Sequence, residues 1–232
     1  MLPDYGEFKR RADLVRARIG TACGLAGRDP ADVELLAVTK FFPVEAVEYA
    51  ARYGLRAVGE NRVQEAAEKK PGAPAGIAWE LIGHLQSNKA RLAVGCFDRI
   101  QSVDSAKLLQ LIDRASGELG KTQPVLLQVN SGHDPAKSGV EPEEAEALLA
   151  AALAHRNLRV EGLMAIAPLS EDPSVARRAF AGLREIRDML GRTLGVALPV
   201  LSMGMSGDLE AAILEGSTIV RVGSALFGAR TT

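Results

Sequence analysis

The stretch ELLAVTKFFPVEAVEYAARYGLRAVGE, residues 34–60, contains one complete copy of the unit from which the fold can be inferred. Its first part, ELLAVTK, is apolar enough for a buried strand. Pro43 suits the first position of a helix, and apolar residues recur along one helical face as far as Gly54. LRAVGE then predicts a second strand. A strand, a helix and a strand in this order predict parallel strands joined by a right-handed crossover.

The same alternation continues through the rest of the chain. The eight predicted strands are residues 34–40, 55–60, 78–83, 98–103, 124–130, 158–166, 197–204 and 217–223. Apolar residues spaced by three or four from Phe8 to Ala22 predict a leading helix. The sequence therefore predicts an α/β fold, a single (β/α)₈ TIM-like barrel with an additional N-terminal helix, spanning residues 1–232 as one domain. A doubly wound open sheet is the alternative, but no glycine-rich turn follows the first strand.

Composition and charge exclude several classes of protein. The net charge is -1, which gives no basic surface for nucleic acid or for an anionic membrane. The chain has no run of apolar residues that predicts a membrane span and no signal-peptide pattern at its start. Cys23 and Cys96 lack metal-ligand spacing, and the three histidines form no zinc motif. We expect a cytoplasmic protein with reduced thiols and no metal site.

Residues that are unusual for a core collect at the carboxyl ends of the predicted strands. They are Lys40, Glu60, Asn61, His84, Gln86, Asn130, Met164, Ser202, Ser206 and Arg221. In a closed barrel these ends form the face that carries the active or binding site. The polarity that any strand end needs explains some of them. Asp104 is placed to cap the helix predicted over residues 105–119.

Two loops at this face suit an anion. SMGMSGD, residues 202–208, follows the seventh strand, and RVGSALFG, residues 221–228, follows the eighth. Both combine glycine and serine before a helix, where free backbone N–H groups and hydroxyls can bind phosphate. The alternative is that Ser206 or Asp208 caps a helix and Ser224 closes a turn. Two such loops on adjacent strands favour phosphate.

Lys40 should lie beside these loops, because the first and eighth strands are neighbours in a closed barrel. It could act as a counter-charge for phosphate. It could instead be a nucleophile that forms a Schiff base, since the nearby charge of Arg221 would ease its deprotonation. A purely structural lysine is the third possibility. The residues alone leave the first two equally supported.

Five segments resemble the pyridoxal-phosphate homeostasis protein family. They are AVTKFFP, GENRVQE, WELIGHLQSNK, GLMAIAP and SMGMSGDLEAAILEGSTIVRVGSALFG. The resemblance implies a barrel similar to the N-terminal barrel of alanine racemase and related decarboxylases, without their additional β-domain. It also implies pyridoxal 5'-phosphate (PLP) as cofactor, held by Lys40 as an internal aldimine.

By motif match, the resemblance assigns further cofactor-binding residues. They are Asn61, Met203, Ser206, Arg221, Gly223 and Ser224, with Met205 also near the phosphate loop. Ser206, Gly223 and Ser224 are similar to phosphate ligands, Arg221 to the partner of the pyridine nitrogen, and Asn61 to a residue near the ring hydroxyl. The loop at residues 130–140 departs from the family at Asp134, where a glutamate is more usual.

The resemblance implies a PLP carrier or buffer and no catalytic residue. A pyridine nitrogen that faces Arg221 stays unprotonated, which weakens the electron sink that PLP catalysis needs. Racemases with this arrangement exist in the related barrel group, so the sink is weakened and not abolished. Related racemases take a second base, a tyrosine, from their extra domain, whereas Tyr5, Tyr49 and Tyr53 are predicted away from the site. We expect a monomer whose recipients are PLP-dependent apoenzymes. The alternatives are a PLP-dependent racemase or decarboxylase, and a cofactor-free aldolase that uses Lys40.

Overall fold

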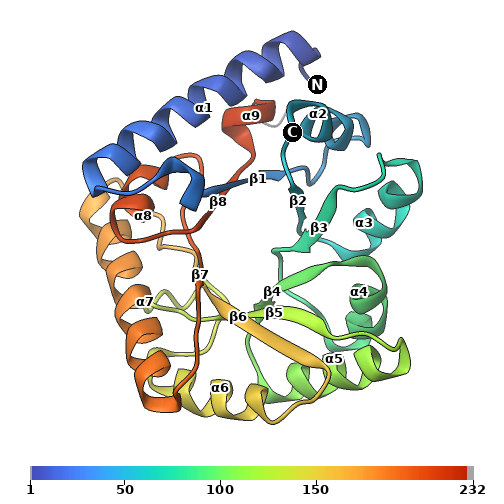
Figure 1. The fold of residues 1–232 in the computed structure, drawn as a ribbon, viewed down its shortest axis with the longest axis vertical. Coiled ribbons are helices and arrows are strands. Elements are labelled where there is room, and N and C mark those ends of the chain that lie inside the picture. Colours follow the sequence, from blue (N-terminus) through green and yellow to red (C-terminus); the bar gives the residue numbers. More distant parts are fainter. Residues whose placement is uncertain (1, 229–232) are drawn as a thin grey trace.

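Eight parallel strands close into a barrel in the computed structural model, which describes residues 2–228 (Figure 1). The strands are β1 (Glu34–Val38), β2 (Ala57–Glu60), β3 (Ala78–Leu81), β4 (Arg99–Val103), β5 (Gln123–Gln128), β6 (Leu158–Met164), β7 (Val200–Ser202) and β8 (Ile219–Val222). They follow one another in chain order, and β1 pairs with β8 to close the barrel. The predicted barrel is confirmed, and the open sheet is wrong.

Helices form an outer ring around the strands (Figure 1). They are α1 (Tyr5–Ala26), α2 (Glu45–Tyr53), α3 (Val63–Lys69), α4 (Ala90–Cys96), α5 (Ala106–Glu118), α6 (Ala145–Leu153), α7 (Pro173–Leu194), α8 (Leu209–Leu214) and α9 (Ser224–Phe227). Several strands end one or two residues before their predicted ends, because the chain there turns outward into the loops of the site. No helix within residues 2–228 has the length and apolar composition to cross a membrane. That residues 1–232 form one domain stays a prediction.

The additional N-terminal helix, α1, covers the barrel beside its last strand. Asp4 caps it by accepting a hydrogen bond from the Glu7 backbone N–H at 2.9 Å. Its buried face packs against α8 and the short α9. The Phe8 ring stacks on Phe227 with 5.2 Å between centroids. Helix α1 therefore completes the outer ring where α9 alone is too short (Figure 1).

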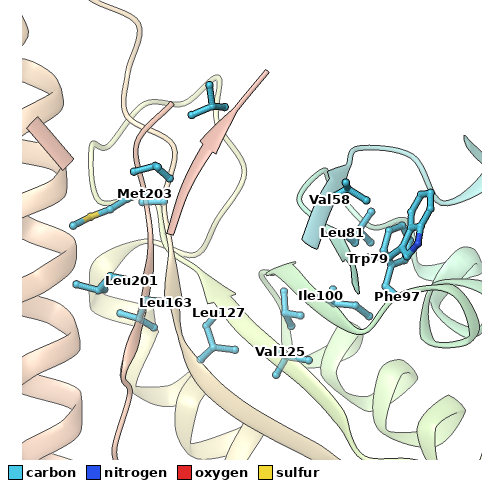
Figure 2. Close-up of a cluster of buried hydrophobic side chains, with 14 of the residues drawn as sticks. Val58, Trp79, Leu81, Phe97, Ile100, Val125, Leu127, Leu163, Leu201 and Met203 are labelled. Carbon is cyan, nitrogen blue, oxygen red and sulfur yellow. The ribbon is translucent and has the colours of Figure 1, made fainter. Parts of the chain in front are cut away.

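The main apolar core lies between the barrel and the helices. Figure 2 shows part of it, with Trp79 and Phe97 on one side of the barrel and Leu163 and Leu201 on the other. Side chains alternate between the two faces of each strand, so the strand neighbours of these core residues face the barrel interior. The interior has only a small apolar cluster around Leu36, and much of the remaining interior is polar.

Gly162 on β6 is a position where the strands pack too closely for a side chain. A Cβ atom there would overlap the carbonyl oxygen of Val200 on β7. We predict that Gly162→Ala lowers the free energy of unfolding by about 1–3 kcal/mol, as overpacking does. Gly20→Ala is the control, because a Cβ there meets nothing within 4 Å on α1. Urea denaturation should show the control unchanged or stabilised by up to about 1 kcal/mol. Equal midpoints for Gly162→Ala and wild type would contradict the prediction.

Candidate functional site

A cavity of about 500 Å³ opens at the carboxyl ends of the strands. This volume lies within the range of small-molecule sites in proteins. Its polar and charged lining residues are Lys40, Asn61, His84, Gln128, Lys137, Ser138, Ser206, Arg221 and Ser224. Glycines 83, 207, 223 and 228 and the apolar residues Val38, Phe42, Ile82, Ala136, Ile166 and Met205 complete the wall. The barrel thus brings six of the seven predicted cofactor-binding residues to one cavity.

Met203 is the predicted residue that the structure does not bring to the cavity. Its side chain is fully buried and lies with Leu201 and Leu163 in the core outside the barrel (Figure 2). Its carbonyl oxygen accepts a hydrogen bond from the Ser217 hydroxyl at 2.7 Å. Met205, two residues further on, is partly exposed and lines the cavity. The strand alternation continues through Met203 and turns its side chain away from the site.

The two glycine- and serine-containing loops meet on one side of the cavity. The Ser206 hydroxyl accepts a hydrogen bond from the Ala225 N–H at 3.3 Å, which joins the loop after β7 to the loop after β8. Arg18 of α1 donates to the Ser206 carbonyl oxygen at 3.0 Å and holds Glu210 in an ion pair at 2.6 Å. Asp208 makes no side-chain cap at α8. The Ala225 N–H lies in the first turn of α9, so the predicted alternative of a helix cap is observed for Ser206 at α9 but not for Asp208 at α8.

Arg221 is buried at the floor of this cavity, and only 4% of its surface is exposed. Its guanidinium donates to the Ser202 hydroxyl and to the Ala165 carbonyl oxygen, both at 2.8 Å. These bonds leave further N–H donors of the same group for a ligand. Burial lowers the pKa of Arg221 to about 10, while the charges of Asp208 and Glu80 act in the opposite direction. The side chain stays cationic near neutral pH.

A chain of hydrogen bonds leads from Arg221 down through the barrel. Ser202, which accepts from Arg221, donates to Gln101 Oε1 at 2.5 Å. Gln101 in turn donates to Glu80, and Arg99 donates to the other oxygen of Glu80 at 2.5 Å. From Arg221 onward each residue donates to the next, and both this chain and Arg99 end at the Glu80 carboxylate. The buried charge of Arg221 is thereby connected to a counter-charge inside the barrel.

The charges around the cavity have one sign. Lys40, Lys137 and Arg221 are cationic, and no aspartate or glutamate is among the described residues that line it. Burial next to cations and hydroxyl donors favours an anionic ligand. Among residues 2–228, no group of three or more histidine, cysteine, aspartate or glutamate side chains could hold a metal ion.

His84 and Glu60, whose roles the sequence leaves open, have different positions. His84 lines the cavity, and its Nδ1 lies 3.6 Å from Asp104 Oδ2. Burial raises the pKa of Asp104. The predicted cap at Asp104 is wrong, since the Ser105 hydroxyl accepts the Leu108 N–H at 3.3 Å. Glu60 is fully buried behind the cavity wall and does not line the cavity.

Sequence reasoning missed the contribution of the loop after β5. Lys137 and Ser138 reach the cavity, as does Gln128 at the end of β5. Gln128 Nε2 donates to the Ser138 carbonyl oxygen at 2.8 Å and so folds the loop back over its own strand. The sequence signal that could have identified these two residues was a lysine and a serine in a glycine-containing loop. The Asp134 carboxylate accepts from the Ala136 N–H at 2.9 Å, so this departure from the family serves the loop itself.

The residues present fit PLP, which carries a phosphate, a ring hydroxyl, a ring nitrogen and an aldehyde. Ser206, Gly223 and Ser224 can surround a phosphate on the side where the two loops meet. Arg221 offers a donor deep in the cavity, and Lys40 offers an amine at its wall. Asn61 lies at the close contact between two loops, where a Cβ atom on Gly83 would overlap the Asn61 backbone.

Comparison with known proteins agrees with this fit. The family described as "Alanine racemase, N-terminal domain" matches residues 14–231. The pyridoxal phosphate homeostasis protein of Aquifex aeolicus is 42% identical over 221 residues, which cover 95% of this chain and 97% of that protein. The protein of the same name from Pseudomonas aeruginosa is 46% identical over 217 residues, 93% of either chain.

Solved structures give the same relationship. The structure of PipY from Synechococcus elongatus with PLP bound superposes with a TM-score of 0.81 at 39% identity, covering 92% of this chain and all of that one (100%). An alanine racemase from Clostridium difficile superposes with a TM-score of 0.78 at 15% identity, covering 98% of this chain and 58% of the racemase. At this low identity the similarity shows the fold alone. This chain belongs to the alanine racemase N-terminal domain family and, within it, to the pyridoxal phosphate homeostasis proteins.

Proposed function

We propose that this protein binds PLP in the cavity and acts as a carrier or buffer in intracellular PLP homeostasis. The observation that carries the proposal is a cavity with three cationic side chains and no carboxylate among its described lining residues, beside two loops of glycine and serine. PLP matches it with a dianionic phosphate and an acidic ring hydroxyl. The PLP-bound structure of the PipY relative supports this choice of ligand.

Each of the six predicted residues that line the cavity then has a defined task. Lys40 supplies the amine that forms a reversible covalent link with the aldehyde, and water is released as the link forms. Ser206, Gly223 and Ser224 bind the phosphate, and Asn61 approaches the ring hydroxyl. Arg221 donates to the ring nitrogen.

The charge of Arg221 supports a carrier over an enzyme. A nitrogen that accepts from a cationic guanidinium remains unprotonated, so the ring draws electrons weakly. Tyr5 and Tyr49 pack together in an aromatic cluster of α1 and α2, and the Tyr53 hydroxyl donates to Asp13 at 2.8 Å. None of these tyrosines lines the cavity. We propose that the cytoplasmic protein works as a monomer, which light scattering tests, and hands PLP to apoenzymes.

A PLP-dependent racemase or decarboxylase is the second candidate, because His84 lies at the cavity within 3.6 Å of Asp104. A histidine paired with a carboxylate could move a proton. The cofactor-free aldolase is a third candidate, and it requires no PLP binding at all.

We predict that Lys40→Ala abolishes the covalent link and keeps weaker binding through the phosphate loops. Wild-type protein with PLP should show a visible absorption band, and borohydride should fix the cofactor on Lys40. The variant should show neither and should bind PLP about tenfold or more weakly. Lys107→Ala, an exposed lysine on α5, is the control. A colourless wild-type protein that gains no band with PLP would refute the carrier and leave the aldolase.

We predict that Ser224→Ala weakens binding of PLP and of pyridoxine 5'-phosphate, which lacks the aldehyde, to the same extent. A hydrogen bond to a charged group contributes about 1.5–3 kcal/mol, so affinity should fall roughly 10- to 100-fold. Titration calorimetry measures both ligands. Ser87→Ala, exposed and outside the cavity, should bind as wild type does. Unchanged affinity for both ligands in Ser224→Ala would contradict the phosphate assignment.

We predict that the PLP-loaded protein does not catalyse exchange of amino-acid α-protons. The loss of the α-proton signal of alanine and other amino acids in deuterated water, followed by proton NMR, should be no faster than with free PLP. The physical reasons are the weakened electron sink of a ring nitrogen that faces Arg221 and the lack of a tyrosine among the described residues that line the cavity. Lys40-dependent exchange well above free PLP would overturn the carrier proposal in favour of the racemase, with His84→Ala then testing the second base.

A further inference from the structure

Lys69, the last residue of α3, is surrounded by acceptors behind the wall that carries Lys40. Its Nζ donates to the Thr39 carbonyl oxygen at 2.9 Å, to Glu60 Oε1 at 2.8 Å and to Glu65 Oε1 at 2.6 Å. Only 11% of its side chain is exposed. Lys69 does not line the cavity. Its contacts therefore require an explanation other than ligand binding.

These contacts reach the backbone on both sides of Lys40. The carbonyl oxygen of Thr39, bound by Lys69, belongs to the peptide unit before Lys40. The N–H of Phe41, in the peptide unit after Lys40, donates to Glu65 Oε1 at 2.5 Å. Because peptide units are planar, fixing both of them fixes the two backbone torsions of Lys40. The direction in which its side chain leaves the backbone is set as a consequence.

The residue after Lys40 has an unusual conformation. Phe41 has φ of 67°, in the left-handed region that non-glycine residues rarely occupy. Its ring is 51% exposed, so core packing does little to hold it there. The Phe42 N–H donates to the Thr39 carbonyl oxygen at 3.1 Å and closes a turn over Lys40 and Phe41, so the carbonyl that Lys69 binds is also the acceptor of this turn.

Glu60 and Thr39 complete the cluster. Thr39 Oγ1 donates to Glu60 Oε1 at 2.7 Å, and both side chains are fully buried. Burial raises the pKa of Glu60, whereas Lys69 acts against that rise as its nearest cation. Lys69 thus balances two carboxylates while it holds the backbone before Lys40.

We propose that Lys69 is a positioning residue that aims the Lys40 amine at the cofactor aldehyde and so sets the rate of covalent capture. The inference rests on the proposed function. In the capture step the neutral Nζ of Lys40 attacks the aldehyde carbon, a C=N bond forms, and the carbonyl oxygen leaves as water with the two amine hydrogens. Lys69 touches neither reactant. Misplacing a reacting group by about 1 Å can slow such a step roughly 100-fold.

The test compares covalent capture with non-covalent binding in the full-length protein. Capture of PLP is followed by stopped-flow absorbance, and borohydride fixation with mass spectrometry identifies the modified lysine. Calorimetry with pyridoxine 5'-phosphate measures binding without the covalent step. Lys69→Met should slow capture about 10- to 100-fold, with affinity for pyridoxine 5'-phosphate within about twofold of wild type. Lys69→Arg, which keeps charge and donors, should recover much of the rate.

Lys70→Met is the matched control, with the same loss of charge one residue further along. Lys70 Nζ donates to the Cys96 carbonyl oxygen at 2.6 Å, away from Lys40, so its variant should capture PLP at the wild-type rate. If Lys69→Met does not fold, Glu65→Ala takes its place, because it removes the acceptor of the Phe41 N–H and should slow capture in the same way.

Two results would overturn the inference. One is a wild-type capture rate in Lys69→Met, and the other is a parallel loss of capture and of pyridoxine 5'-phosphate affinity, which indicates general damage to the site. Failure of the proposed function is distinguishable from both. It would appear in the wild-type protein, as absence of any PLP fixed on Lys40.

Discussion

A cationic side chain enclosed in the barrel is the constraint on which the site depends. Arg221 is almost fully buried, and an unpaired charge in such a place would be strongly destabilising. The hydrogen bonds through Ser202 and Gln101 to Glu80, which also pairs with Arg99, offset part of this cost, although burial still lowers the pKa of Arg221. They join side chains from β3, β4, β7 and β8, so they require these strands to hold their register. These residues account for part of the polar interior of the barrel.

The two faces of each strand therefore have separate functions. Outward side chains form the apolar core with the helices, where Trp79 and Phe97 are fully buried. Inward side chains such as Glu80 carry the polar chain toward Arg221. Arg221 pairs in register with Leu36 of β1, so the strand that leads to Lys40, two residues beyond its end, is held directly beside it. The pairing of β1 with β8 that closes the barrel therefore brings the Lys40 amine and the Arg221 guanidinium to the same cavity.

The barrel and most of the site could be predicted because both follow from local patterns. Strand–helix alternation determines the topology, and the topology places Lys40 and Asn61 at one face. The side chain of Met203 was expected near the cofactor because its place in the motif was considered without the alternation of strand side chains, which turns it into the outer core. Lys137 was missed because its place depends on a loop folded back by the bond between Gln128 and Ser138, ten residues apart. Such contacts between distant residues leave no periodic signal in the sequence.

The charge pattern that suits the proposed ligand also opposes catalysis on it. A cavity without carboxylates among its described lining residues favours a dianionic phosphate. The same lack leaves no acidic partner for a ring nitrogen, and in the proposed binding mode Arg221 faces that nitrogen and keeps it unprotonated. Adding a carboxylate beside the ring would strengthen the electron sink, but it would place an anion in the cavity that binds the phosphate. In the proposed function, reversible holding and weak chemistry are thus two consequences of one arrangement of charges.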